Sequence, residues 1–246
     1  MIGVRTDDLD WRSAVAELPA STRLAEEAEG SIVVVSGTAD PGLLEKPAVV
    51  LLADPVLPAG AVPSAGAPVV VDRAWLRADL VADAGAHPDA LLLSAECAAP
   101  HGLVGTAVRD AIGWLRVLAG GPLALDAAHA TASGAIALLR AGDRAATLCV
   151  TVLADPAARS HLRALAVGVE RVEVTTDDAG AASVSVSSPA GELALPTRFE
   201  SRQRVALRRA LQAASQGSTA DLEELRHDEE LAADVLLAYK RALSPA

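Results

Sequence analysis

Runs of consecutive apolar residues dominate the first third of the chain. Three have the length of a strand and few polar positions, at 31–37, 48–54 and 67–72. Such runs are typical of parallel strands that are buried on both faces of a helix-covered sheet. With a further strand at 1–5 and a helix at 8–18, they predict a parallel α/β domain over residues 1–88. The Pro- and Gly-rich stretch 55–68 is expected to be a loop where a crossover helix would normally lie, so the domain is a truncated one.

After residue 88 apolar and polar residues alternate along several segments. A strand at 89–99 and an amphipathic helix at 104–120 come first. Strand-like segments then follow at 122–132, 134–142, 144–154, 161–176, 181–188 and 191–197. Alternation of this kind favours an antiparallel sheet with one covered face. The expected fold class is therefore α/β plus α+β, in which residues 89–246 form a domain with a large, mostly antiparallel sheet and packing helices.

Two helices are expected to close the chain. The first covers about 198–215, and the second starts near Ser218, which fits a capping box with Asp221. The second helix places a set of apolar residues on one face: Leu222, Leu225, Leu231, Val235, Leu236 and Tyr239. The charged run 227–230 in the same helix is expected to be a solvated face.

Composition excludes several classes of partner and location. The net charge is −11, aromatic residues make up 2% of the chain and there is no basic tract, so nucleic-acid binding is not expected. The longest apolar run, 47–53, is too short to span a bilayer. The acidic N-terminus has no apolar core of a signal peptide. Cys97 and Cys149 are expected to be buried, reduced thiols in a cytoplasmic protein without a membrane anchor.

Three segments resemble the Gfo/Idh/MocA family, named after glucose-fructose oxidoreductase and inositol dehydrogenase. They are "RDAIGWLRVLAGGPLALDAA" (109–128), "GAIALLRAGDRAATLCV" (134–150) and the closing helices from 198 to 242. The resemblance implies a nucleotide-binding Rossmann domain followed by an α+β domain. It also implies an NAD- or NADP-dependent oxidoreductase that acts on a sugar, a polyol or a related hydroxy-compound. Catalytic members carry three recognisable elements.

The first element is a glycine-rich turn after strand one, which brings the backbone close to the pyrophosphate of the dinucleotide. Gly3 is present here, but Thr6, Asp7 and Asp8 occupy the turn. Asp8 or Asp10 is suited to cap the following helix, in the place that a bound phosphate would take. The sequence therefore predicts no bound dinucleotide, and no other cofactor or metal.

The second element is a Glu-Lys-Pro sequence at the end of a strand, with the lysine in the active site. Glu45–Pro47 matches the letters but precedes a strand. The matching position by topology is Asp72, Arg73 and Ala74. An arginine essentially never deprotonates, so Arg73 is expected to orient a substrate group rather than to transfer a proton. Asp72 is expected to contact the substrate.

The third element is a histidine three residues before a helix aspartate. Asp110 matches the aspartate, but Ala107 stands in the place of the histidine. His101, in the loop just upstream, is the remaining candidate for proton transfer. Glu96 lies near the end of a strand, where it either contacts a substrate or points to water.

Loss of these elements in a matching framework leads to the first hypothesis. The chain is a degenerate relative of the oxidoreductases, without dinucleotide binding or hydride transfer, that acts as a binding or scaffold module and forms a dimer through its C-terminal sheet. The second is a diverged NAD- or NADP-dependent oxidoreductase, with Arg73, Asp110 and His101 catalytic and Asp72 and Glu96 binding substrate. A third, partnership with an active paralogue, fits the sequence equally well.

Overall fold

The computed structural model describes residues 1–37, 46–56 and 66–243. The chain divides into two compact units, each built from two separate segments. Unit 1 comprises Met1–Ala78 and Phe199–Arg226, and unit 2 comprises Asp79–Arg198 and His227–Ala246. This division differs from the expected domains 1–88 and 89–246, because the chain returns to unit 1 after residue 198 before it re-enters unit 2.

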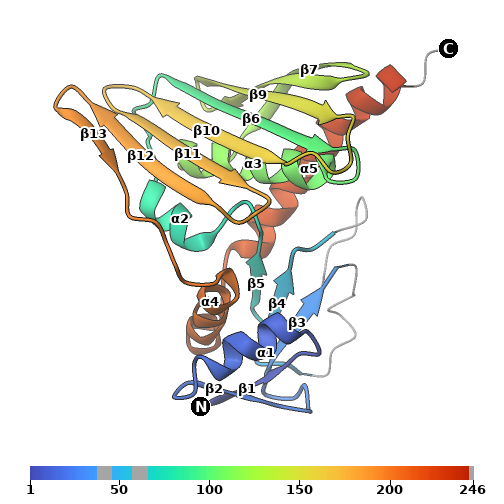
Figure 1. The fold of residues 1–246 in the computed structure, drawn as a ribbon, viewed down its shortest axis with the longest axis vertical. Coiled ribbons are helices and arrows are strands. Elements are labelled where there is room, and N and C mark those ends of the chain that lie inside the picture. The colour runs from blue at the N-terminus through green and yellow to red at the C-terminus, as the bar shows by residue number, and fades with distance from the viewer. Residues whose placement is uncertain (38–45, 57–65, 244–246) are drawn as a thin grey trace. The chain divides into compact units, whose positions relative to one another are not determined.

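Unit 1 contains a five-stranded parallel sheet (Figure 1). Its strands are β1 (Ile2–Arg5), β2 (Thr22–Leu24), β3 (Ile32–Ser36), β4 (Val49–Ala53) and β5 (Val69–Asp72), in the order β2-β1-β3-β4-β5. The apolar runs are thus confirmed as parallel strands, and every residue of β4 is buried. The three-residue strand β2 was not expected, because its sequence Thr-Arg-Leu has no apolar run. Of the loop expected at 55–68, residues 57–65 lie outside the described part of the chain.

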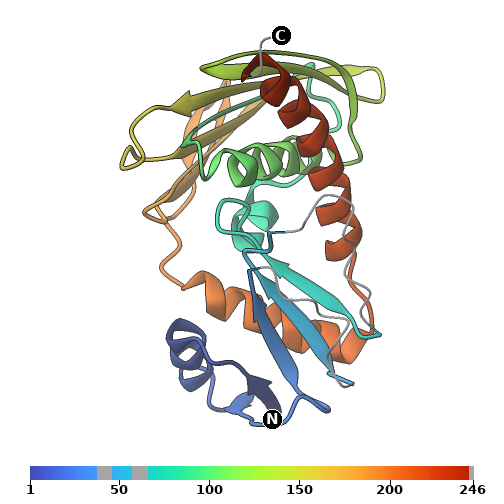
Figure 2. The same ribbon diagram turned by 90° about the vertical axis from the view of Figure 1, so that its right-hand side faces the viewer.

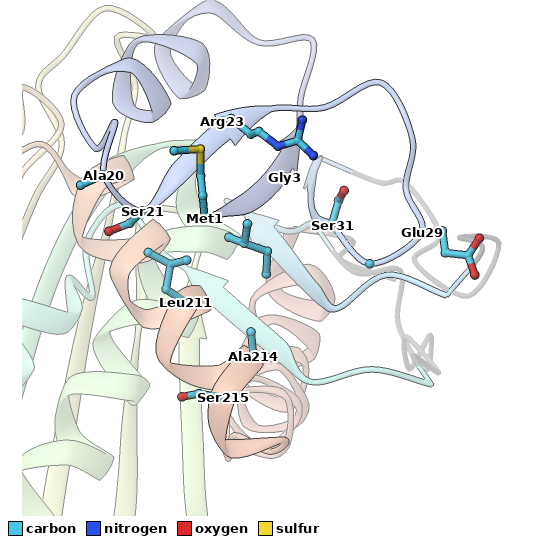
Figure 3. Close-up of a pocket in the computed structure, with 12 residues that line it drawn as sticks. Met1, Gly3, Ala20, Ser21, Arg23, Glu29, Ser31, Leu211, Ala214 and Ser215 are labelled. Carbon is cyan, nitrogen blue, oxygen red and sulfur yellow. The ribbon is translucent and has the colours of Figure 1, made fainter.

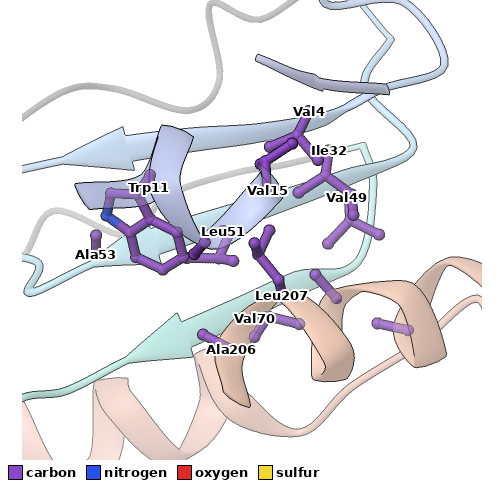
Figure 4. Close-up of a cluster of buried hydrophobic side chains, with 13 residues drawn as sticks. Val4, Trp11, Val15, Ile32, Val49, Leu51, Ala53, Val70, Ala206 and Leu207 are labelled. Atoms are coloured by element: carbon purple, nitrogen blue, oxygen red, sulfur yellow. The ribbon is translucent and has the colours of Figure 1, made fainter. Parts of the chain in front are cut away.

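Helices cover both faces of this sheet. On one face α1 (Leu9–Ala16) and α4 (Arg202–Gln216) pack together, and Figure 4 shows Trp11 and Leu207 pointing toward Leu51 and Val70. On the other face Leu225, near the start of α5 (Asp221–Leu243), packs on the alternate residues of β3, β4 and β5. Each helix lies within a turn or two of the range expected for it. The helix α2 (Ala78–Ala84) follows β5.

Unit 2 contains an eight-stranded sheet in the order β13-β12-β11-β10-β6-β9-β8-β7. Its strands are β6 (Leu92–Pro100), β7 (Ala124–Thr131), β8 (Gly134–Ala141), β9 (Arg144–Leu153), β10 (His161–Val167), β11 (Arg171–Asp177), β12 (Ala182–Ser188) and β13 (Gly191–Ala194). Neighbours are antiparallel except β6 and β9, so the mostly antiparallel sheet is confirmed. The run 161–176, expected to be continuous, is a hairpin that turns at Gly168–Glu170, where only one glycine marks the turn.

One face of this sheet is covered by α3 (Val104–Ala119), which ends at Gly120 with a φ of 74°. Figure 2 shows α3 and the later part of α5 on the same side of the sheet. Both cysteines are free, as expected, but only Cys97 is buried. Glu96 is paired with Cys149 in the register of β6 and β9, so Cys149 lies on the exposed face while Cys97 faces α3. The expectation that Cys149 is buried is therefore wrong.

Candidate functional site

Asp54 and Asp72 lie at the carboxyl edge of the parallel sheet, where the neighbouring strands β4 and β5 end. In open α/β sheets this edge is the usual place for ligands. Asp54 has a φ of 43°, and its Oδ1 accepts a hydrogen bond from the amide of Ala74 at 2.9 Å. Arg202, the first residue of α4, binds both carboxylate oxygens of Asp54 and lies 3.4 Å from Oδ2 of Asp72. The edge thus holds an arginine between two carboxylates.

Asp72 is the more buried of the two acids, with 5% of its surface exposed. Burial raises the pKa of Asp72 from 3.8 to about 6, against the opposing attraction of Arg202 and with a further rise from Asp54. Arg73 is also buried, at 4% exposure. The structure therefore places the expected pair at the predicted strand end, but among protein groups rather than on an open surface.

The outer edge of β5 is covered by side chains from the segment that returns to unit 1. The amide of Val71 donates to Oδ2 of Asp221 at 2.9 Å, and its carbonyl accepts from Nη1 of Arg209 at 3.2 Å. Thr219 donates through Oγ1 to the carbonyl of Val69. Because β5 is an edge strand, these contacts satisfy backbone groups that another strand would otherwise bind. Asp221 therefore has a different role from that expected of it in a capping box.

The turn between β1 and α1 tests whether a dinucleotide fits. Oδ1 of Asp8 accepts from the amides of Asp10 at 2.8 Å and Trp11 at 3.4 Å, so the helix start is bound by its own carboxylate. These amides are the donors that a pyrophosphate uses in a Rossmann fold. A Cβ at Gly3 would lie 2.7 Å from Oγ of Ser31, so this glycine serves close packing. The carboxylate of Asp8 therefore occupies the helix start at which a Rossmann fold binds a pyrophosphate.

A pocket of about 680 Å³ lies at the opposite edge of the same sheet (Figure 3). It is formed around the start of β1 and by α4, and its lining residues include Met1, Arg23, Glu29, Leu211 and Ser215. None of the site residues expected from the sequence lines this pocket. Its place at the amino ends of the strands differs from that of ligand sites in open α/β sheets.

Asp110 lies inside unit 2, on α3, and its side chain has no exposed surface. Its Oδ1 accepts from Nε of Arg109 at 2.8 Å, and Nη1 of Arg109 lies 3.2 Å from Oε1 of Glu229 on α5. The structure therefore places Asp110 in a buried ion-pair network between two helices. It does not present Asp110 on a surface that a substrate would reach.

The other two expected residues of unit 2, His101 and Glu96, are exposed, unlike Asp110. The ring of His101 is 6.2 Å from the ring of Tyr239, between centroids. Glu96 projects from the uncovered face of the sheet, 3.8 Å from Nη1 of Arg163. The helix α3, with Asp110, lies on the opposite face, so Glu96 and Asp110 do not share a site.

A second buried ion pair was missed by the sequence analysis. Arg116 of α3 donates to both carboxylate oxygens of Asp228, at 2.9 and 3.3 Å. Nδ1 of His227 lies 3.5 Å from the same carboxylate, and its Nε2 is within hydrogen-bond distance of the backbone of Leu123. The nearby carboxylate of Asp228 raises the pKa of His227. The solvated face expected at 227–230 is therefore wrong for Asp228, which pairing with Arg116 allows to be fully buried.

The described residues contain neither a candidate metal site nor a helix that could cross a membrane. No group of three or more histidine, cysteine, aspartate or glutamate side chains in this part of the chain is arranged to bind a metal. Among the described helices, none has the length and the apolar character needed to cross a bilayer.

Comparison with known proteins identifies the fold. No protein-family model and no curated protein matches the sequence. A UDP-N-acetylglucosamine 3-dehydrogenase from Acidithiobacillus ferrooxidans is similar in structure, with a TM-score of 0.64, 13% identity and coverage of 99% of this chain and 98% of that one. An oxidoreductase from Sinorhizobium meliloti gives a TM-score of 0.63 at 10% identity, over 98% and 97% of the two chains. A 3-ketoreductase from Actinomadura kijaniata, in complex with NADP and TDP-benzene, gives 0.56 at 12%, over 97% of each. The chain therefore has the fold of these oxidoreductases, a Rossmann-like part and a large antiparallel part, as the resemblance implied.

Proposed function

We propose that this chain is a degenerate relative of the Gfo/Idh/MocA oxidoreductases, which has lost dinucleotide binding and hydride transfer and acts as a binding or scaffold module. The observation that carries the proposal is the carboxylate of Asp8, which accepts from the amides of Asp10 and Trp11 at the start of α1. A pyrophosphate would have to displace this carboxylate and would meet the exposed charges of Asp7 and Asp10 beside it.

Isothermal titration with NADH and NADPH tests the loss of cofactor binding. We expect no heat of binding at millimolar dinucleotide, and the Actinomadura 3-ketoreductase is the positive control because it is known with NADP. Micromolar binding of either dinucleotide to this chain would contradict the proposal. The matched variant is Asp8→Ser, which keeps a cap for α1 but removes the charge.

A second candidate is a diverged NAD- or NADP-dependent oxidoreductase acting on a sugar, a polyol or a related hydroxy-compound. Its support is the fold shared with a UDP-N-acetylglucosamine 3-dehydrogenase and a 3-ketoreductase. In this case Arg73 would orient a substrate group and Asp72, whose pKa is about 6, would exchange a proton near neutral pH. A polyol-dependent change in nicotinamide absorbance that Arg73→Ala abolishes would favour this candidate over the first.

We further propose that the exposed face of the eight-stranded sheet mediates dimerisation, or binding to an active paralogue. The apolar part of this face is formed by Ile136 and Leu138 of β8, which are 62% and 43% exposed, next to Cys149 of β9. Beside it lies a charged part, in which Arg163 donates to Oε1 of Glu173 at 2.7 Å. Both parts are suited to bind a protein surface with matching apolar and charged groups.

Light scattering during size-exclusion chromatography tests this surface. We expect a dimer that Ile136→Glu dissociates, while the control Leu193→Glu, an exposed position on the edge strand β13, leaves the mass unchanged. A monomeric wild-type chain would exclude self-association. Co-purification of a paralogue from the native host would then distinguish the second type of partner.

A further inference from the structure

Arg202 connects α4 to the ends of two strands in unit 1. Its guanidinium binds both oxygens of Asp54, and its Nη1 lies 3.4 Å from Oδ2 of Asp72. Asp54 is fixed from a second side by the amide of Ala74. Oδ2 of Asp72 is buried and accepts no hydrogen bond from the described residues, and Arg202 approaches it as an ion-pair partner only. Arg202 thus attracts Asp72 electrostatically, but no hydrogen bond joins it to Oδ2 of Asp72.

We propose that Arg202, Asp54 and Asp72 form a proton-sensitive clasp, which sets how tightly the returning segment 199–226 is held on the parallel sheet of unit 1. The clasp is a conformational device in addition to the proposed function, and it does not depend on that function. It joins residues that lie 130 positions apart at the carboxyl edge, between Asp72 and Arg202.

The charges that face Asp72 come from three directions. Arg202 and Arg209 approach from α4, and Arg77 approaches from the segment that follows β5. Asp54 faces it from the end of β4, while Asp221 at the start of α5 is paired with Arg209. Burial and the charge of Asp54 favour the neutral acid, and the three arginines favour the carboxylate. Burial has the largest effect, and the clasp therefore holds a proton that a hydrated aspartate would lose.

The sign of the pH dependence follows from this difference. Where α4 leaves the sheet, Asp72 becomes hydrated and its pKa returns toward 3.8, while in the closed clasp it is about 6. Between these two values the closed state binds a proton that the open state has lost, so the closed state becomes weaker as pH rises. The opening constant is expected to rise by up to about tenfold per pH unit, roughly 100-fold in total, and to level off above the higher pKa.

Hydrogen exchange of the full chain tests the clasp. Exchange of α4 amides, corrected for intrinsic rates, would be compared at several values between pH 4 and 8 with that of β8 amides in unit 2. We expect the steep rise in α4 alone. Asp72→Asn should abolish the rise, while Asp7→Asn, at an exposed aspartate of the same unit, should preserve it. A rise that survives in Asp72→Asn, or no rise in the wild-type chain, would overturn the proposal.

A carboxyl-carbon NMR titration of the wild-type chain gives an answer even if Asp72→Asn does not fold. The Asp72 resonance should titrate with a midpoint of about 6. Arg202→Met removes the strongest attraction for the carboxylate, so it should move the midpoint upward, whereas Arg208→Met on the same helix should leave it in place. A midpoint near that of a hydrated aspartate, or one insensitive to Arg202→Met, would refute the clasp.

Discussion

Arg209 and Asp221 form an ion pair beside the outer edge of β5, with Nη2 of Arg209 lying 2.6 and 2.7 Å from the two carboxylate oxygens. Each partner also binds the backbone of Val71, one its carbonyl and the other its amide. The pair therefore replaces the next strand of the sheet. The contacts with Val71 explain why the side chains of Arg209, on α4, and Asp221, at the start of α5, are held in fixed positions.

Removing this pair should lower the stability of unit 1. Asp221→Ala leaves the Val71 amide without its acceptor, and an unsatisfied backbone group costs about 1–3 kcal/mol when it is buried. We expect a loss of this size in the free energy of unfolding, measured with urea. The control Arg208→Ala breaks the ion pair with Glu200 at a more exposed position and should cost less than about 1 kcal/mol. Equal losses in both variants would contradict the role of Asp221.

The cap of α1 should also be measurable. Asp8→Ala removes the acceptor for the amides of Asp10 and Trp11 and should lower the free energy of unfolding by about 1 kcal/mol. Asp7→Ala, one residue earlier and also exposed, is the control and should be nearly neutral. An unchanged stability of Asp8→Ala would show that another group takes over the cap.

Gly134 at the start of β8 should not tolerate a side chain. A Cβ at this position would lie 2.0 Å from the carbonyl oxygen of Val150, so the two strands would have to separate. We expect Gly134→Ala to lower the free energy of unfolding by about 1–3 kcal/mol. Gly102→Ala, where a Cβ meets open space, should be nearly neutral and provides the comparison.

The pair between Arg116 and Asp228 should dominate the stability of the contact between α3 and α5. Asp228→Asn leaves the guanidinium of Arg116 buried beside a neutral amide, and loss of one partner of a buried pair costs about 3–5 kcal/mol. Calorimetry of the wild type and the variant would measure the loss. A change below about 1 kcal/mol would contradict the structural role of this pair.

His227 should add a pH dependence to the same contact. Its pKa is raised by Asp228, so the folded chain binds the histidine proton more tightly than the unfolded chain does. This contribution is present below the ordinary pKa of 6.5 and is lost as pH rises through the higher folded value. The difference in unfolding free energy between wild type and His227→Gln should therefore shrink as pH increases through that range. A constant difference would show that His227 stays neutral.

The strands could be predicted because burial on one or two faces leaves a pattern in the sequence. The run that became β4 and the alternation that became β8 are examples. The hairpin within 161–176 was missed because Gly168 is its only strong turn signal. The domain organisation could not be predicted either, because the helical periodicity of 202–216 does not show on which sheet this helix packs.

Much less of the candidate site was predictable. Asp72 and Arg73 were found because a strand end in an α/β sheet has a known meaning. Asp54 and Arg202 were missed because each is a charged residue beside a loop or a helix start, and only the fold brings them together. The same reason applies to Asp228, which pairs with an arginine 112 positions earlier. A buried ion pair has no local periodicity, so a sequence shows its members but not their partners.

The return of residues 199–226 to unit 1 has a consequence for biosynthesis. Chains generally begin to fold from the N-terminus while they are still being made. Here the first 78 residues lack Leu207, Leu225 and the cover of β5 until residues 199–226 have left the ribosome. The larger segment of unit 2, Asp79–Arg198, has been synthesised before that point. The parallel sheet of unit 1 is therefore expected to keep buried-type apolar surface uncovered until residues 199–226 have been made.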